Sequence, residues 1–317
     1  MRKTYFFHSH RFSLQPSKPS AAHRHFGANF AHDLYRISQR YLYHGDKPMT
    51  NQHFEILQFL ADARLATSSQ LARLFFAESP THRSQIRRSN LATKQLKEAG
   101  LIYHQPRKIG GWTRGSSSYI WSLTYKSWKK LKEVNSSISL RFRNRVDFSQ
   151  NHVEHTLAIT EIFVELKELE RLGEIKLEEF HYEPKSWRYY SDIGGSSLVL
   201  KPDAFAKIIV GEYEDFYFFE LDRSSESLTR IVNTCKKYIQ YYNTGIEQRV
   251  NDIFPFVLWI VPDERRKENI SNAIHLKLNN FWQMFQVVTL DEFSQFIHGE
   301  YSDKQQDWIW SKYWSKH

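Results

Sequence analysis

The sequence predicts an α+β protein with two folded domains, a small helical domain followed by a larger domain with a mixed central sheet. The chain has 317 residues, enough for roughly two domains of about 150 residues each. Hydrophobic residues make up 41% of the chain and charged residues 25%, proportions that are typical of folded proteins. The pattern also changes along the chain: short helices and a hairpin are predicted before residue 150, and helices alternating with apolar strands after it.

Charge separates the two halves of the chain. Residues 1–150 contain 25 Lys and Arg against 8 Asp and Glu, a net of +17, whereas residues 151–317 contain 19 against 27, a net of −8. A basic N-terminal half is typical of proteins that bind nucleic acid or an acidic membrane surface. The acidic half is compatible with a metal site lined by carboxylates.

Composition excludes several classes of protein. The single cysteine, Cys235, excludes a disulfide framework and a zinc module with several cysteines. No apolar run approaches the length of a membrane-spanning helix. The first residues are basic and aromatic without an apolar core, so a secretory signal is not predicted and we expect a cytoplasmic protein without membrane partners.

Residues 50–130 show the element order of a winged helix-turn-helix. Thr67 is a suitable N-cap for the second helix, and Gly100 is a suitable end for the third. Two extended segments flank a glycine-rich stretch, which predicts two strands joined by a wing. The predicted elements are helices at residues 54–60, 67–75 and 84–99 and strands at residues 101–104 and 118–123.

The third helix of this domain carries a basic face. At 100° per residue, one set of polar side chains stays within about 40° of a single direction, while the apolar residues point about 160° to 220° away. Cations on such a face suit DNA phosphates, and an asparagine can pair with adenine in the major groove. The predicted DNA-binding residues are Arg83, Arg87, Asn90, Lys94 and Lys97 on the helix and Arg107, Lys108 and Arg114 on the wing. The alternative is an ordinary solvated helix in a winged helix that contacts proteins.

The chain is therefore divided into five segments. We predict a basic flexible arm over residues 1–48, a winged-helix DNA-binding domain over 49–134, a basic linker over 135–150, a second domain over 151–298 and an aromatic C-terminal tail over 299–317. In the second domain, helices are predicted at residues 152–173, 226–242 and 264–281, and strands at 175–182, 198–210, 216–221, 253–261 and 285–290.

Acidic residues follow apolar strands in the second domain. Glu220 and Asp222 stand at the end of one strand, and Asp203 lies in the preceding one. Two neighbouring strands could bring Asp203 and Glu220 together, and like charges at short range require a cation. Oxygen ligands without a cysteine cluster favour Mg²⁺ or Mn²⁺ over structural zinc.

Four pieces of the sequence resemble a known family. These are His-Thr-Leu-Ala-Ile-Thr at residues 155–160, Lys-Pro-Asp-Ala at 201–204, Phe-Glu-Leu-Asp-Arg at 219–223, and the run from Phe254 to Arg266 that ends in Pro-Asp-Glu-Arg-Arg. In this order and spacing they resemble the replication-relaxation family of plasmid and mobile-element proteins, which is akin to the MobC-type relaxases of conjugative mobilisation.

The resemblance implies a winged helix joined to a restriction-endonuclease-like α/β domain of the PD-(D/E)xK type, and metal-dependent cleavage of DNA. Asp203 and Glu220 match the two acids of the pattern, and the backbone carbonyl of Leu221 would be a third metal ligand. Glu161 or Glu165 would match an additional acid on the first helix. A metal held in this way would orient a nucleophile and neutralise charge on the leaving oxygen.

The sequence departs from the family pattern at one position. Asp222 occupies the position of the usual lysine, so the positive charge would have to come from Arg223 or from Lys236 or Lys237 on the next helix. Alternatively, Asp222 is a further metal ligand, or the site no longer cuts.

We therefore expect a relaxase-like or nickase-like endonuclease that binds double-stranded DNA at a plasmid origin and nicks one strand with Mg²⁺ or Mn²⁺, for mobilisation or replication. The alternative is a non-catalytic replication initiator or transcriptional regulator whose second domain is a degenerate nuclease fold. A homodimer and accessory proteins of mobilisation or replication are compatible partners.

Overall fold

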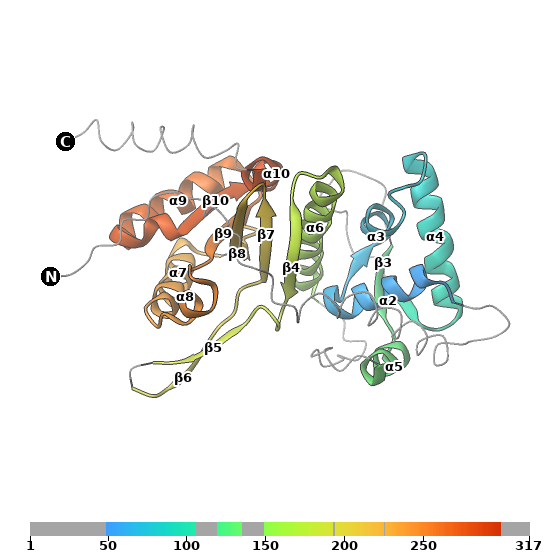
Figure 1. Cartoon of the computed structure of the whole chain (residues 1–317), viewed down its shortest axis with the longest axis horizontal. Coiled ribbons are helices and arrows are strands. Elements are labelled where there is room, and N and C mark those ends of the chain that lie inside the picture. Colours follow the sequence, from blue (N-terminus) through green and yellow to red (C-terminus); the bar gives the residue numbers. More distant parts are fainter. Residues whose placement is uncertain (1–48, 106–118, 135–148, 193, 225, 299–317) are drawn as a thin grey trace. The chain divides into compact units, whose positions relative to one another are not determined.

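The computed structural model describes residues 49–105, 119–134, 149–192, 194–224 and 226–298 (Figure 1). Contacts divide the chain into two compact units, with the boundary between Val164 and Glu165. We call the described residues up to Val164 the N-terminal unit and those from Glu165 the C-terminal unit. The predicted arm, the wing, the C-terminal tail and most of the predicted linker lie outside the described residues.

The N-terminal unit combines helices with a three-stranded antiparallel sheet of order β1-β3-β2. Its elements are α2 (Asn51–Ala63), β1 (Ala66–Thr67), α3 (Ser68–Phe75), α4 (His82–Glu98), β2 (Ile102–His104), β3 (Ile120–Leu123), α5 (Tyr125–Val134) and the first half of α6 (Gln150–Leu172). The short strand β1 was not predicted from the sequence.

Threonines begin three of these helices. Thr50, Thr67 and Thr81 each accept a hydrogen bond from the backbone N–H three residues later, and the side chain of that later residue bonds back to the threonine N–H. Such capping boxes satisfy two backbone donors that a helix start leaves open. Gly100 ends the turn after α4 with φ of +67°, a conformation that favours glycine. The predicted cap at Thr67 and stop at Gly100 are therefore confirmed.

The first half of α6 packs within the N-terminal unit. The rings of Phe59 and Phe163 stack with centroids 5.6 Å apart. The Thr160 hydroxyl donates to the Leu65 carbonyl at 2.9 Å, and the Gln70 amide donates to the Leu157 carbonyl at 3.0 Å. The division between the units consequently falls inside α6.

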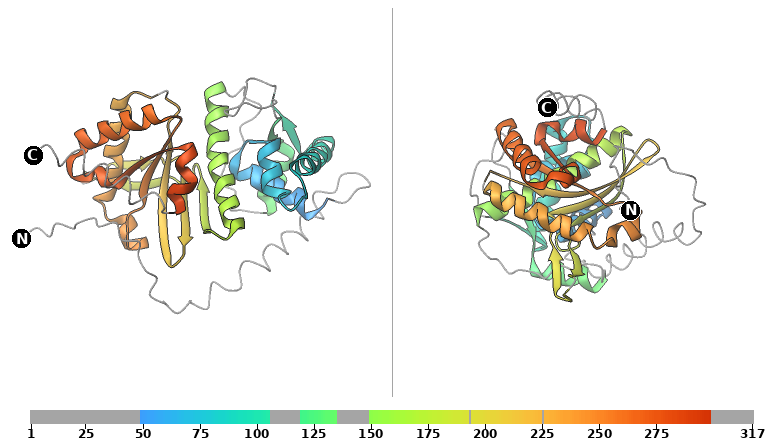
Figure 2. Two further views of the ribbon diagram at one scale, coloured as in Figure 1. Left: turned by 90° about the horizontal axis from the view of Figure 1, so that it is seen from above. Right: turned by 90° about the vertical axis from the view of Figure 1, so that its left-hand side faces the viewer.

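The C-terminal unit is built on a five-stranded mixed sheet of order β10-β9-β8-β7-β4 (Figure 2). Strands β4, β7 and β8 are antiparallel neighbours, and β8, β9 and β10 are parallel. After α6 the unit continues through β4 (Lys176–Tyr182), β5 (Arg188–Ser191), β6 (Ser197–Leu200), β7 (Ala204–Val210), β8 (Tyr213–Leu221), α7 (Leu228–Tyr242), α8 (Ile246–Asn251), β9 (Phe256–Val261), α9 (Glu264–Leu278), the 3-10 helix η1 (Asn279–Met284), β10 (Phe285–Thr289) and α10 (Leu290–His298).

Strand β8 is buried on both faces, and its side chains alternate between two groups of helices. Phe218 lies in a core cluster with Tyr238 of α7 and Ile270 of α9. Phe219 points the other way, with its ring centroid 6.0 Å from that of Phe293 on α10. By this alternation Glu220 lies on the same side as Phe218, toward α7.

A two-stranded hairpin of β5 and β6 extends from the sheet (Figure 1). The sequence predicts one continuous strand over residues 198–210, which is wrong because the chain leaves the extended pairing between Leu200 and Ala204. Pro202 stands in this break, and proline cannot donate a ladder hydrogen bond. Helices α8 and α10 were also not predicted.

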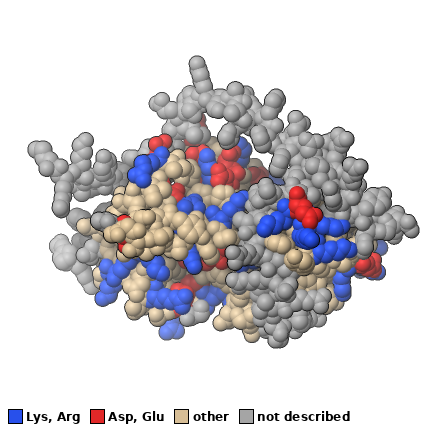
Figure 3. All heavy atoms as spheres, turned by 90° about the horizontal axis from the view of Figure 1, so that it is seen from below, with Lys and Arg blue, Asp and Glu red and all other residues tan. Residues whose placement is uncertain are grey.

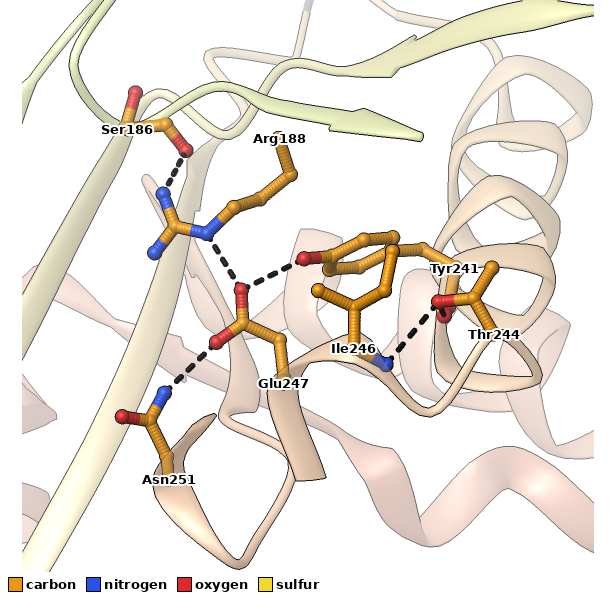
Figure 4. A network of polar contacts seen from close by, with 7 residues as sticks. All are labelled: Ser186, Arg188, Tyr241, Thr244, Ile246, Glu247 and Asn251. Carbon is orange, nitrogen blue, oxygen red and sulfur yellow. Dashed lines mark hydrogen bonds and ion pairs between the residues drawn. The ribbon is translucent and has the colours of Figure 1, made fainter. Parts of the chain in front are cut away.

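A buried ion pair holds the base of this hairpin against α7 and α8 (Figure 4). Arg188 donates from Nε to Glu247 Oε1 at 2.5 Å, and its guanidinium lies over the rings of Phe205 and Phe218. The Tyr241 hydroxyl and the Asn251 amide also donate to the Glu247 carboxylate, at 2.9 and 2.8 Å. The charge of Glu247 is thus fully hydrogen-bonded although the residue is buried.

Within the described residues, no helix combines the length and the apolar character needed to cross a membrane.

Candidate functional site

Helix α4 presents a polar, cationic face. Its buried side includes Ala92 and Leu96, which pack into the core of the N-terminal unit. All five predicted DNA-binding residues of this helix are exposed: Arg83, Arg87, Asn90, Lys94 and Lys97. Only Glu98 adds an acidic side chain to α4, and it pairs with Lys94 at 3.8 Å on the surface. The predicted wing residues Arg107, Lys108 and Arg114 lie outside the described residues.

Helix α5 adds a second group of cations to the same unit. It carries Lys126, Lys129, Lys130 and Lys132 within ten residues. Figure 3 shows Lys and Arg side chains gathered on the face of the N-terminal unit that carries this helix. Lys132 lies over the Trp128 ring at 5.1 Å from its centroid, so part of this charge rests on an aromatic surface.

In the C-terminal unit, the end of β8 brings Asp203 and Glu220 together. Asp203 lies immediately before β7, and its N–H donates to the Phe219 carbonyl at 3.1 Å. Its carboxylate Oδ2 accepts a hydrogen bond from the Leu221 N–H at 2.8 Å. Asp203 is therefore fixed to the backbone on both sides of Glu220.

Glu220 is enclosed between the sheet and α7, with 9% of its surface exposed. Burial, followed by the negative charge of Asp203, raises the pKa of the Glu220 carboxyl well above its usual range. The Tyr238 hydroxyl donates a hydrogen bond to Glu220 Oε1 at 2.5 Å. This hydrogen bond favours the ionised carboxylate and so lowers the pKa of Glu220, against the two larger effects. Burial and the charge of Glu220 in turn raise the pKa of Tyr238, so its hydroxyl remains a proton donor.

This arrangement fits a hard divalent cation. The charges of Glu226 and Glu183 also raise the pKa of Glu220, so four carboxyl groups contribute negative potential at one end of the sheet. Mg²⁺ is commonly bound by one or two carboxylates together with water and substrate phosphates. Among the described residues, no group of three or more His, Cys, Asp or Glu side chains is arranged as a complete metal cage. Asp203 and Glu220 are the two carboxylates at this end of the sheet that could contact such an ion.

Asp222, in the position where the pattern has lysine, is held by an arginine. Arg266 at the start of α9 donates from Nε to Oδ2 at 2.5 Å and from Nη2 to Oδ1 at 3.1 Å. The Ser224 N–H donates to the same carboxylate at 3.1 Å. Both Asp222 oxygens are therefore already engaged by donors of the chain.

Other predicted site residues lie apart from this pair of acids. Lys236 and Lys237 are exposed on α7, whereas Tyr238 is the residue of that helix that reaches Glu220. The Glu161 carboxylate accepts hydrogen bonds from Arg73 and Gln70 of α3, inside the N-terminal unit. Glu165 is half-buried in the second half of α6, in the C-terminal unit.

Sequence reasoning missed Tyr238 and Arg266 as parts of this site. A signal for Tyr238 was present, because it follows Ile231 and Cys235 at intervals of four and three residues, the spacing of one helix face. For Arg266 only its place in the quoted Pro-Asp-Glu-Arg-Arg run drew attention. Its partner Asp222 is 44 residues away, which no local pattern reveals.

A family model described as replication-relaxation matches residues 57–257, more than half of the chain. The chain belongs to the replication-relaxation family. This confirms the resemblance seen in the sequence, and the family suggests a role in replication or mobilisation of plasmids or mobile elements. The matched residues include α4, Asp203, Glu220 and Tyr238 of this replication-relaxation protein, whereas Arg266 lies beyond them. No curated protein and no solved structure matches the chain.

Proposed function

We propose that the protein binds duplex DNA through the N-terminal unit and nicks one strand at Asp203 and Glu220 with Mg²⁺ or Mn²⁺. The observation that carries this proposal is the buried Glu220 carboxyl beside Asp203, whose backbone contacts flank it on both sides. Two acids in such contact need a cation when both are ionised. An acidic pair in a protein that also carries an exposed cationic helix suits chemistry on a polyanion.

The N-terminal unit supports the DNA-binding part of the proposal. Its order of α2, β1, α3, α4, β2 and β3 is the order of a winged helix, in which the helix at the position of α4 enters the major groove. Exposed Arg and Lys side chains would contact phosphates and fix the register. Asn90, in the middle of the exposed face, would read adenine through its amide.

In the C-terminal unit, side chains and backbone groups of the chain would hold the metal ion and orient its ligands. A bound Mg²⁺ or Mn²⁺ would supply Lewis-acid stabilisation of charge on the phosphate oxygens. Asp203 and Glu220, with the Leu221 carbonyl, would hold the ion. The Leu221 N–H orients one Asp203 oxygen, and the Tyr238 hydroxyl orients one Glu220 oxygen.

The test is a nicking assay on supercoiled plasmid that carries the origin of the replicon encoding this protein. The unaltered protein is expected to produce nicked circles with Mg²⁺ or Mn²⁺ and none with EDTA. Asp203→Asn and Glu220→Gln should abolish nicking while retaining DNA binding in a gel-shift assay. Glu212→Gln is the matched control, because Glu212 is exposed in the turn at the opposite end of β7 and β8.

A second function is favoured by one observation. Asp222 replaces the lysine of the pattern, and both Lys236 and Lys237 are exposed on α7. We therefore keep a non-catalytic initiator or regulator as the alternative, in which the C-terminal unit has lost cleavage. Absence of nicking with either metal, combined with a site-specific gel shift by the unaltered protein, would support this alternative and contradict cleavage.

A further inference from the structure

The charge at residue 222 is reversed with respect to the nuclease pattern, and the structure places a cation against it. Arg266 reaches Asp222 from α9, the helix that contributes Ile270 and Ile274 to the core cluster around Phe218 and Tyr238. Asp222 directly follows β8, two residues after Glu220, and its N–H donates to the Ile260 carbonyl of β9 at 3.0 Å, so Asp222 continues the pairing of that strand. Arg266 of α9 therefore places a positive charge next to the residue that follows the acidic site on the chain.

Arg266 and Asp222 form a bidentate ion pair. Two guanidinium nitrogens donate to the two Asp222 oxygens, and Nη2 also donates to the Glu226 carbonyl at 2.6 Å. Bidentate pairing fixes the plane of a guanidinium as well as its position. Through Glu226 and Asp222, Arg266 is tied to both ends of the segment that follows β8.

One part of Arg266 is left open. The Asp222 side chain is completely covered, whereas the Arg266 side chain retains 14% of its surface. Its Nε and Nη2 are used, but Nη1 donates no hydrogen bond to any residue that the structure describes. The pair therefore combines a positively charged donor that is fixed in place with a side chain that is partly exposed.

We propose that Arg266 is the phosphate-binding cation of the acidic site and takes the role that lysine has in the pattern. This inference rests on the proposed function. Asp222 then holds Arg266 in position and is not a metal ligand, because its side chain is completely covered and both of its oxygens accept hydrogen bonds from the chain. The free Nη1 would donate to a non-bridging oxygen of the DNA phosphate, and the guanidinium charge would offset the negative charge that develops there.

The experiment compares the unaltered protein with the neutral pair Asp222→Asn with Arg266→Gln. Changing both residues together leaves no single buried charge, so the fold should persist and thermal unfolding checks that it does. We expect nicking of the origin-bearing plasmid with Mn²⁺ to fall by roughly a hundredfold or more, as for loss of one donor to a developing charge. Arg266→Lys, which keeps the charge without the bidentate pairing, should fall between the two.

A second readout does not depend on cleavage. Sulfate is a tetrahedral oxyanion, so millimolar magnesium sulfate should raise the Tm of the unaltered protein above its value in magnesium chloride, and this difference should disappear in the neutral pair. Lys277→Ala, which removes an exposed cation from the other end of α9, should retain it.

Each outcome decides the inference. A folded neutral pair that nicks within a few-fold of the unaltered protein, with its sulfate shift intact, would show that Arg266 is only structural. Should the neutral pair unfold, Asp222→Asn with Arg266→Met takes its place, and the same result in that folded variant would have the same meaning. Failure of the unaltered protein to nick would overturn the proposed function, and the sulfate shift would then test Arg266 alone, with its absence overturning the inference.

Discussion

The two units use charge in opposite ways. On α4 the cations stand in solvent, and the only ion pair within that helix, Lys94 with Glu98, keeps 71% and 65% of its side-chain surfaces exposed. The C-terminal unit also contains ion pairs that are largely buried, such as Arg188 with Glu247, whose side chains keep 19% and 5% of their surfaces exposed. Exposed charge is free to meet a partner, whereas buried charge must be satisfied inside the fold.

The contrast in charge burial identifies the contacts that define each unit. The N-terminal unit derives its fold from apolar residues and capped helices, so its cationic face can change without loss of structure. In the C-terminal unit the fold and the acidic site share residues, because Tyr238 is at once a core residue and the donor to Glu220.

The largest expected effect breaks the buried pair. Glu247→Ala would leave Arg188 charged and buried without its partner, and we expect a loss of about 3–5 kcal/mol in the free energy of unfolding. Glu98→Ala, which breaks the exposed pair, should cost about 0–1 kcal/mol. Urea unfolding of both variants measures the difference. Similar losses for the two would contradict the contrast between the units.

The next effect concerns the metal. If the acidic end of β8 holds the ion, Mn²⁺ should stabilise the unaltered protein by about 2.7 kcal/mol when its concentration is a hundred times Kd. Glu220→Gln should lose this stabilisation, and Glu212→Gln should retain it. Thermal unfolding with and without Mn²⁺ gives the result, and equal shifts in all three proteins would place the ion elsewhere.

A smaller effect is expected on α4. Arg87→Ala and Lys94→Ala should each weaken DNA binding, because each removes a phosphate contact. The slope of log K against log salt concentration should become smaller in magnitude by about one in each variant. Stability should change little, since both side chains are exposed. Binding titrations at several salt concentrations provide the slope, and a slope unchanged in both variants would argue against α4 as the DNA-binding helix.

The smallest effect is a pH dependence present in both units. Burial lowers the pKa of His53 in the N-terminal unit and of His181 in the C-terminal unit below 6.5. The folded state therefore binds fewer protons than the unfolded state, and stability present above pH 6.5 is lost as the pH falls through the lowered pKa values. His53→Gln and His181→Gln should each reduce this acid-side loss. NMR titration in which both histidines titrate at or above pH 6.5 would refute it.

Local patterns predicted most of the helices and most of the strands. The exposed face of α4 follows from counting 100° per residue, and the starts and ends at Thr67 and Gly100 follow from the chemistry of helix caps. The hairpin of β5 and β6 was missed because its strands have four residues each and a proline follows. Short pairings of this kind leave too few residues for a period to be recognised.

The site was harder to predict than the fold. The hypothesis about Asp203 and Glu220 used only the ends of two strands, but the partner of Asp222 is set by the packing of α9 against the sheet. Lys236 and Lys237 were chosen for their charge, although the helix face that meets the sheet carries Cys235 and Tyr238. Which side chains meet at the site depends on how the helices pack against the sheet, and residue types alone do not reveal this.

One contact at the acidic site belongs to the backbone alone. The donor that fixes Asp203 is the N–H of Leu221, so every amino acid except proline would supply it at that position. Leu221 is itself buried, so its side chain is constrained by packing and not by this hydrogen bond. This contact depends on the path of the backbone, so a comparison of side chains alone would not detect it.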